Sequence, residues 1–180
     1  MNRVKISLFI AGVLSLVGCK STSAVDDGLA LRKSKPIQLF MGTCVVGREN
    51  ATSLEKMASH KGFVTAPDNV AQSYLSGNKG KAWYLSDSTG SYGLTLLESN
   101  LCSVYVHQGD PDKIQASMEA WLPPADSGFT YEKELISHKG SLTTTSYTLY
   151  SGQKVLEQWL LTVNREGGSG LVAIMSYQKT

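Results

Sequence analysis

The chain has three histidines, and their spacing predicts neither a metal centre nor a catalytic triad. His60, His107 and His138 are far apart in sequence, no two stand four residues apart, and no His-Glu-x-x-His motif is present. His107 is the best candidate for a binding role, because it shares a predicted strand face with Ser103 and Tyr105 near the strand end. We therefore expect no metal ion and no cofactor, and we name Tyr105 and His107 as candidate binding residues.

The serine motifs do not predict a hydrolase. Two Ser-x-x-Lys sequences begin at Ser53 and Ser76, but the Ser-Asp-Asn element of penicillin-recognising enzymes is missing from its proper place. Ser53 is better explained as part of a helix cap, since Thr52-Ser53-Leu54-Glu55 has the capping-box pattern and predicts the start of a helix. No Gly-x-Ser-x-Gly sequence is present. We therefore predict that the protein has no catalytic residues and is not an enzyme.

Aromatic side chains are the remaining candidates for a ligand site. Trp83, Tyr84, Trp121 and Trp159 could together line a groove. Trp121 lies on an apolar helical stripe and Trp159 on a mixed strand face, so core packing is the alternative for both. We add Trp83 to the candidate binding residues.

The N-terminus has the parts of a secretion signal. Arg3 and Lys5 form a basic region, and the twelve residues from Ile6 to Val17 are mostly apolar. Twelve residues are too few to cross a bilayer, which needs roughly 20. The sequence Leu16-Val17-Gly18-Cys19 resembles the lipobox of bacterial lipoproteins.

This resemblance implies a lipid anchor. In bacterial lipoproteins the cysteine thiol is diacylglycerated and the preceding peptide is removed, so 1–18 would be the signal peptide and Cys19 the acylated first residue. Lys20, in place of an aspartate, favours the periplasmic face of the outer membrane, with the inner membrane as the alternative. The other interpretation is an ordinary signal peptide that is cut near a cysteine.

The mature chain is predicted to be electrically neutral. The full chain has 17 Lys and Arg against 15 Asp and Glu, and removal of Arg3 and Lys5 leaves 15 of each. A neutral chain without a basic block argues against nucleic-acid binding.

Two cysteines remain after Cys19 is assigned to lipid. In an oxidising compartment Cys44 and Cys102 most simply form one disulfide, and the alternative is two buried free thiols.

The hydrophobic periodicity predicts an α+β fold. Polar residues 19–35 are expected to form a flexible tether, and 36–180 a single α+β domain. Its N-terminal helices and one later helix are expected to pack on an antiparallel meander sheet. Helices are expected at about 36–45, 52–61, 67–75 and 110–122, and strands at 82–85, 92–97, 101–107, 129–136, 142–150, 155–164 and 171–177.

The globular part is similar to a group of small uncharacterised exported proteobacterial proteins. The similarity consists of Cys44 in an early helix, Gly62-Phe63 after the second helix, Trp83, and then Cys102-Ser103-Val104. It implies no activity.

These observations favour a non-enzymatic lipoprotein that binds a periplasmic protein, as an inhibitor, immunity or envelope-assembly factor. Residues 143–148 are rich in hydroxyl side chains and are predicted to form an edge strand that accepts a partner. A module for a small ligand or a cell-wall glycan is the first alternative, and a hydrolase the second. An open strand edge would favour the first function, an aromatic groove the second, and a cleft with His107 and acids the third.

Overall fold

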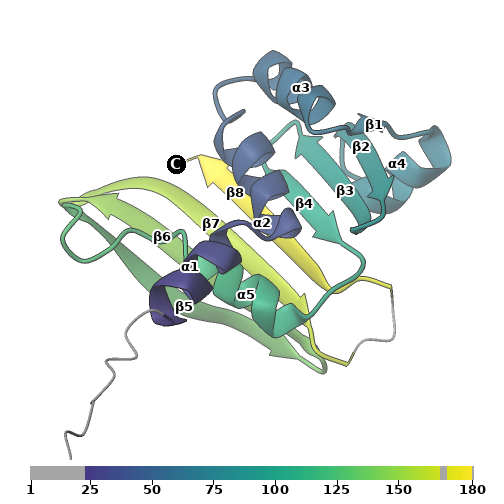
Figure 1. The fold of residues 1–180 in the computed structure, drawn as a ribbon. Helices are drawn as coiled ribbons and strands as arrows, with labels where there is room; N and C mark the ends of the chain where they lie inside the picture. The colour runs from purple at the N-terminus through teal and green to yellow at the C-terminus, as the bar shows by residue number, and fades with distance from the viewer. Residues whose placement is uncertain (1–22, 167–169, 180) are drawn as a thin grey trace, which may run out of the picture.

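The computed structural model describes residues 23–166 and 170–179, which form five helices and one eight-stranded antiparallel sheet (Figure 1). The helices are α1 Ser23–Arg32, α2 Lys35–Phe40, α3 Ala51–His60, α4 Asp68–Leu75 and α5 Pro111–Glu119, with a π-helical segment η1 Met41–Val45 after α2. The strands are β1 Val64–Thr65, β2 Gly80–Asp87, β3 Gly90–Leu97, β4 Cys102–Val106, β5 Phe129–Lys139, β6 Leu142–Ser151, β7 Lys154–Asn164 and β8 Ala173–Lys179. The predicted α+β class is confirmed, while the lipobox and Cys19 lie outside the described residues.

The predicted tether is partly helical. The sequence predicts an irregular segment over 19–35, but α1 occupies Ser23–Arg32. Its last turn is held by α5, because Arg32 Nε donates a hydrogen bond to the Ala120 carbonyl at 2.6 Å and Trp121 Nε1 donates to the Arg32 carbonyl at 3.4 Å. The sequence analysis missed this helix because α1 has no amphipathic stripe and is stabilised by contacts with a distant segment.

Two helix starts follow local rules, one of them not as predicted. Asp110, where a helix is predicted to begin, caps α5, since its Oδ1 accepts hydrogen bonds from the backbone N–H groups of Asp112 and Lys113 at 2.9 and 3.2 Å. The predicted capping box at Thr52 is wrong. Asn50 is the N-cap of α3 instead, and its Oδ1 accepts from the Ser53 N–H at 2.8 Å.

The sheet consists of two meanders joined in its middle. The strand order is β1-β2-β3-β4-β8-β7-β6-β5, and every neighbouring pair is antiparallel. The last strand of the first meander, β4, pairs with the last strand of the second, β8. As a result β5 lies at one edge of the sheet and the short β1 at the other.

One face of the sheet, which we call the helix-covered face, carries the core. Leu94, Val104, Met175 and Leu161 are neighbours across β3, β4, β8 and β7, and all are at most 1% exposed. Helix α2 contacts β4, and α5 contacts both β7 and α2, so these two helices lie side by side over this face (Figure 1). Each such buried side chain contributes about 1.5–3 kcal/mol relative to an exposed one.

The disulfide joins this face to the helical layer. Cys44 in η1 and Cys102 in β4 form a bond across a sequence separation of 58, and both residues are at most 2% exposed. Between η1 and α3, Gly47 allows close approach, because a Cβ there would lie 2.8 Å from the Leu54 Cα. The covalent bond therefore fixes the N-terminal helices to the centre of the sheet.

Removal of the disulfide should lower stability substantially. We expect the double substitution Cys44→Ala and Cys102→Ala to reduce the free energy of unfolding by about 4 kcal/mol, because the unfolded chain regains the entropy of an open loop. Urea unfolding measures this change, and wild-type protein treated with a reductant should match the double variant. Equal stability of the oxidised wild type and the double variant would contradict the prediction.

None of the helices in the described part of the chain combines the length and apolar character that crossing a bilayer requires.

Candidate functional site

Tyr105 and His107, two of the predicted binding residues, lie together on the face of β4 opposite the helix-covered face. Helix α4 brings Tyr74 against them, with ring centroids 5.0 Å from Tyr105 and 5.8 Å from His107. The Tyr105 hydroxyl donates to the Tyr74 carbonyl at 3.0 Å. Gly93 in β3 makes room for the Tyr74 ring, because a Cβ at that position would collide with it.

Both ring nitrogens of His107 are already bonded within the fold. Nδ1 lies 2.5 Å from the Gly170 carbonyl oxygen, which can only accept, so Nδ1 carries the proton. Nε2 then accepts a hydrogen bond from the Tyr74 hydroxyl at 2.9 Å. Burial, and then Tyr105, raise the pKa of Tyr74, so this hydroxyl keeps its proton. His107 thus ties α4 and β4 to the segment before β8.

Trp83, the third predicted binding residue, does not join this cluster. It pairs with Leu94 across β2 and β3, which places it on the helix-covered face, where it is 4% exposed. Tyr105 and His107 lie on the other face because side chains alternate along a strand. The sequence could not separate them, since the face of each residue depends on the register between strands.

The other two histidines, His60 and His138, also lie apart from the cluster of Tyr74, Tyr105 and His107. His60 ends α3 and is exposed, and His138 Nδ1 lies 3.0 Å from the Thr143 hydroxyl at the end of β5. Within residues 23–166 and 170–179, no group of three or more histidine, cysteine, aspartate or glutamate side chains could hold a metal ion.

An aromatic hollow of about 420 Å³ lies at the ends of β7 and β8 on the helix-covered face. Trp121 and Trp159, two of the four aromatic residues considered for a groove, line it together, whereas Trp83 and Tyr84 do not. The other main lining residues come from η1, β5, β6 and β8, namely Met41, Val45, Phe129, Leu149, and Tyr177.

Glu157 is the polar centre of this hollow. Its Oε1 accepts a hydrogen bond from Trp159 Nε1 at 3.1 Å, and its Oε2 lies 3.9 Å from Arg48 Nη1. Burial, and then the negative charge of Glu157, raise the pKa of Tyr177 to about 12, while Arg48 partly opposes this shift. The carboxylate therefore already has partners from the protein, and the exposed walls of the hollow are largely apolar.

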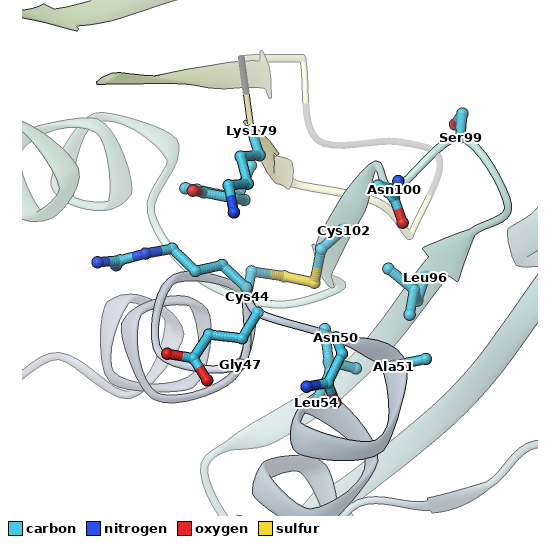
Figure 2. A pocket seen from close by; sticks show the side chains of 13 residues that line it. Cys44, Gly47, Asn50, Ala51, Leu54, Leu96, Ser99, Asn100, Cys102 and Lys179 are labelled. Carbon is cyan, nitrogen blue, oxygen red and sulfur yellow. A yellow bond between two sulfur atoms is a disulfide. The ribbon is translucent and has the colours of Figure 1, made fainter.

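A second hollow, of about 380 Å³, adjoins the first and shares Arg48, Tyr177 and Lys179 with it. Figure 2 shows the disulfide between Cys44 and Cys102 at its centre. The two hollows together form a surface that the sequence analysis did not find, because its residues come from seven separate segments.

Strand β5 is the most exposed of the seven longer strands of the sheet. Ten of its eleven residues are exposed, Ser137 alone being half-buried, and it pairs with β6 on one side only. Its apolar side chains Phe129, Tyr131, Leu135 and Ile136 are 43 to 62% exposed. The predicted edge strand at 143–148 is wrong, because β6 lies between β5 and β7. Hydroxyl content identified the right hairpin but not the strand that ends the sheet.

The hydrogen-bond pattern shows which backbone groups of β5 point outward. The Arg165 N–H donates to the Ser141 carbonyl at 3.2 Å, so the register neighbours Leu142 and Asn164 are a non-hydrogen-bonded pair of β6 and β7. Leu142 and every second residue of β6 therefore direct their backbone groups to β5, where Ser146 and Thr148 face Glu134 and Glu132.

The remaining residues of β5 direct their N–H and C=O groups away from the sheet. These residues are Tyr131, Lys133 and Leu135, which pair with the intervening residues of β6. Such a row of outward groups is the template on which another strand can add.

A half-buried carboxylate, Glu119, holds β5 to the helical layer. Glu119 at the end of α5 accepts three hydrogen bonds on Oε1, from Lys133 and Tyr147 at 2.7 Å each and from Gln115 at 2.9 Å. Burial alone would raise the pKa of Glu119, but these hydrogen bonds outweigh it and lower the pKa. Burial and then Glu119 raise the pKa of Tyr147 well above its ordinary range. Lys133 thus points inward and leaves the edge itself accessible.

Comparison of the chain with protein-family models, curated proteins and solved structures gives no match. The candidate surfaces therefore rest on the residues and their geometry.

The protonation of Tyr177 should make stability depend on alkaline pH. An unfolded chain loses this proton near pH 10, whereas the folded chain holds it to about pH 12. Because the folded state binds the proton more tightly, the stabilisation is complete below about pH 10 and is lost as the pH rises through about 12.

We expect the unfolding free energy of the wild type to fall more steeply over this range than that of Tyr177→Phe. Urea unfolding at several pH values measures both slopes. Tyr84→Phe, a substitution of an exposed tyrosine, is the matched control. Parallel curves for the wild type and Tyr177→Phe would contradict the assignment.

Proposed function

We propose that this chain is a lipid-anchored protein of the periplasmic face of the outer membrane that binds another protein through strand β5, without catalysis. The observation that carries this proposal is the open edge of β5, with outward backbone groups at Tyr131, Lys133 and Leu135. An extended segment of a partner can pair with these groups and continue the sheet, a common mode of peptide recognition.

The exposed apolar side chains of β5 support the same interpretation. Tyr131 and Leu135 flank Lys133 on the helix-covered side of the edge and are 43% and 62% exposed. A partner strand that paired with β5 would cover part of this apolar surface, which stabilises association by about 25 cal/mol per Å². Main-chain pairing would then supply direction and register.

The anchor rests on the N-terminal sequence. Leu16-Val17-Gly18-Cys19 resembles a lipobox, and each buried CH₂ of an acyl chain adds about 0.8 kcal/mol of membrane affinity. More than one chain on Cys19 would hold the protein permanently at the bilayer. Anchored in this way, the domain would meet partners in the periplasm or in the membrane.

Small-ligand or glycan binding in the aromatic hollow is the second candidate function. The half-buried Trp121 and the 46% exposed Phe129 offer ring surfaces on its walls. We do not propose catalysis at His107, because its ring nitrogens are engaged by Tyr74 and Gly170.

A proline in β5 should weaken partner binding without unfolding the protein. Tyr131→Pro removes an outward N–H, which lies on the solvent side of an edge strand, where proline is tolerated. One hydrogen bond is worth about 0.5–1.5 kcal/mol and the proline ring obstructs a neighbouring strand, so we expect about tenfold weaker capture.

Tyr131→Ala is the matched control, because it removes the same side chain and keeps the N–H. Capture from detergent-solubilised envelopes, with circular dichroism to verify folding, measures the difference. Equal capture by the folded proline and alanine variants would refute the edge-binding proposal. Loss of capture in Trp121→Ala alone would favour the hollow.

Substitution of Cys19 tests the anchor. Cys19→Ser should lose metabolic labelling with palmitate, and the protein should stay unprocessed or become soluble, because serine cannot form the thioether. Fractionation with membranes after cleavage, despite the substitution, would contradict the lipoprotein interpretation.

A further inference from the structure

The side of β5 opposite Lys133 carries two carboxylates that the fold leaves uncompensated. Glu132 and Glu134 lie on the face of the sheet opposite the helix-covered face, and both are exposed. Tyr150 donates a hydrogen bond to Glu132 Oε2 at 2.7 Å, but no ion pair of either carboxylate is recorded within the described residues. Lys133 between them points to the other face and is paired with Glu119 at 2.7 Å.

The spacing of these carboxylates matches the repeat of a strand. Residues two apart on a strand lie about 7 Å apart on the same face, so a partner strand would present every second side chain to Glu132 and Glu134. Because the outward backbone groups belong to Tyr131, Lys133 and Leu135, an added antiparallel strand would form hydrogen-bonded pairs with those three residues. Glu132 and Glu134 would then stand in non-hydrogen-bonded pairs, in which opposing side chains are closest.

From this arrangement we infer that β5 selects an extended partner segment of the pattern apolar–basic–uncharged–basic–apolar. The inference rests on the proposed edge function and names the chemistry of its partner. The two basic side chains, two positions apart, oppose Glu134 and Glu132. The uncharged residue opposes Lys133, whose charge is already neutralised, and the apolar residues cover Leu135 and Tyr131.

The same charges disfavour a second copy of this chain as the occupant. Antiparallel pairing of β5 with itself, centred on Lys133, sets Lys133 opposite Lys133 and Glu132 opposite Glu134. Pairing centred on either glutamate sets that glutamate opposite its own copy. Like charges directly opposite each other destabilise a strand pair, so these three central registers of self-pairing are disfavoured.

Three blocked, dye-labelled peptides test the inference on the full-length protein in detergent micelles. The first is Thr-Val-Lys-Thr-Lys-Val-Thr, and the other two carry glutamate or serine in place of both lysines. Fluorescence anisotropy at low ionic strength measures their affinities, because exposed charge pairs weaken as salt rises. We expect the lysine peptide to bind about tenfold more tightly than the glutamate peptide, with the serine peptide between them.

The charge reversal Glu132→Lys with Glu134→Lys should invert this order, and Tyr131→Pro should weaken binding of all three peptides. The double substitution Glu55→Lys with Glu98→Lys, which makes the same charge change on exposed residues outside β5, should leave the order unchanged.

Equal affinities of the three peptides, all lost in Tyr131→Pro, would overturn the charge inference while leaving edge binding intact. Binding of none of them would overturn both. A dimer of the wild type that Tyr131→Pro dissociates would also overturn the inference, because β5 would then be occupied by its own copy.

Discussion

The pairing of β4 with β8 is the interaction on which the arrangement of this protein depends. It joins two antiparallel meanders that are separated in sequence by α5, and it places Val104 beside Met175 at the centre of the core. Since the second meander is attached through its last strand, its strands run outward from the centre in reverse order. Strand β5, the first of them, therefore ends the sheet, and one side of its backbone pairs with no other strand of the described residues.

An exposed edge of this length would be a liability for aggregation without further control. Here the charges provide that control, because Lys133 points toward the core side and binds Glu119, while Glu132 and Glu134 lie on the opposite face. The register also shifts between Leu135 and Ser137, which interrupts the regular ladder toward the far end of β5. The edge is thus open in its first half, and its charges limit which strands can pair with it, as the proposed binding of a partner segment requires.

Local features were predictable from the sequence, and long-range features were not. The helix that begins at Asp110, the helical segment that contains Cys44 and the seven longer strands follow from periodicity and from turn residues close in the chain. The disulfide was predictable by elimination, because the expected acylation of Cys19 and the expected oxidising compartment leave Cys44 and Cys102 for each other. The strand order, and with it the edge, depends on the β4–β8 pairing, which no local pattern encodes.

The candidate site residues show the same difference between local features, which the sequence predicts, and long-range features, which it does not. Tyr105 and His107 could be grouped because residues two apart on a strand lie on the same face. Trp83 was wrongly placed with them, because its face depends on its pairing with Leu94 in the neighbouring strand. No sequence pattern identified Glu157 and Tyr177 as site residues, since the hollow that they share is assembled from distant segments of the chain.

The aromatic hollow and the β5 edge are physically continuous rather than two separate surfaces. Phe129 lines the hollow and is also the first residue of β5. Its backbone lies two residues before Tyr131, so it has the same outward direction as the groups that would pair with a partner. A ligand in the hollow and a strand added at the edge would therefore both meet Phe129, and the two functions considered for this protein share a common boundary at this residue.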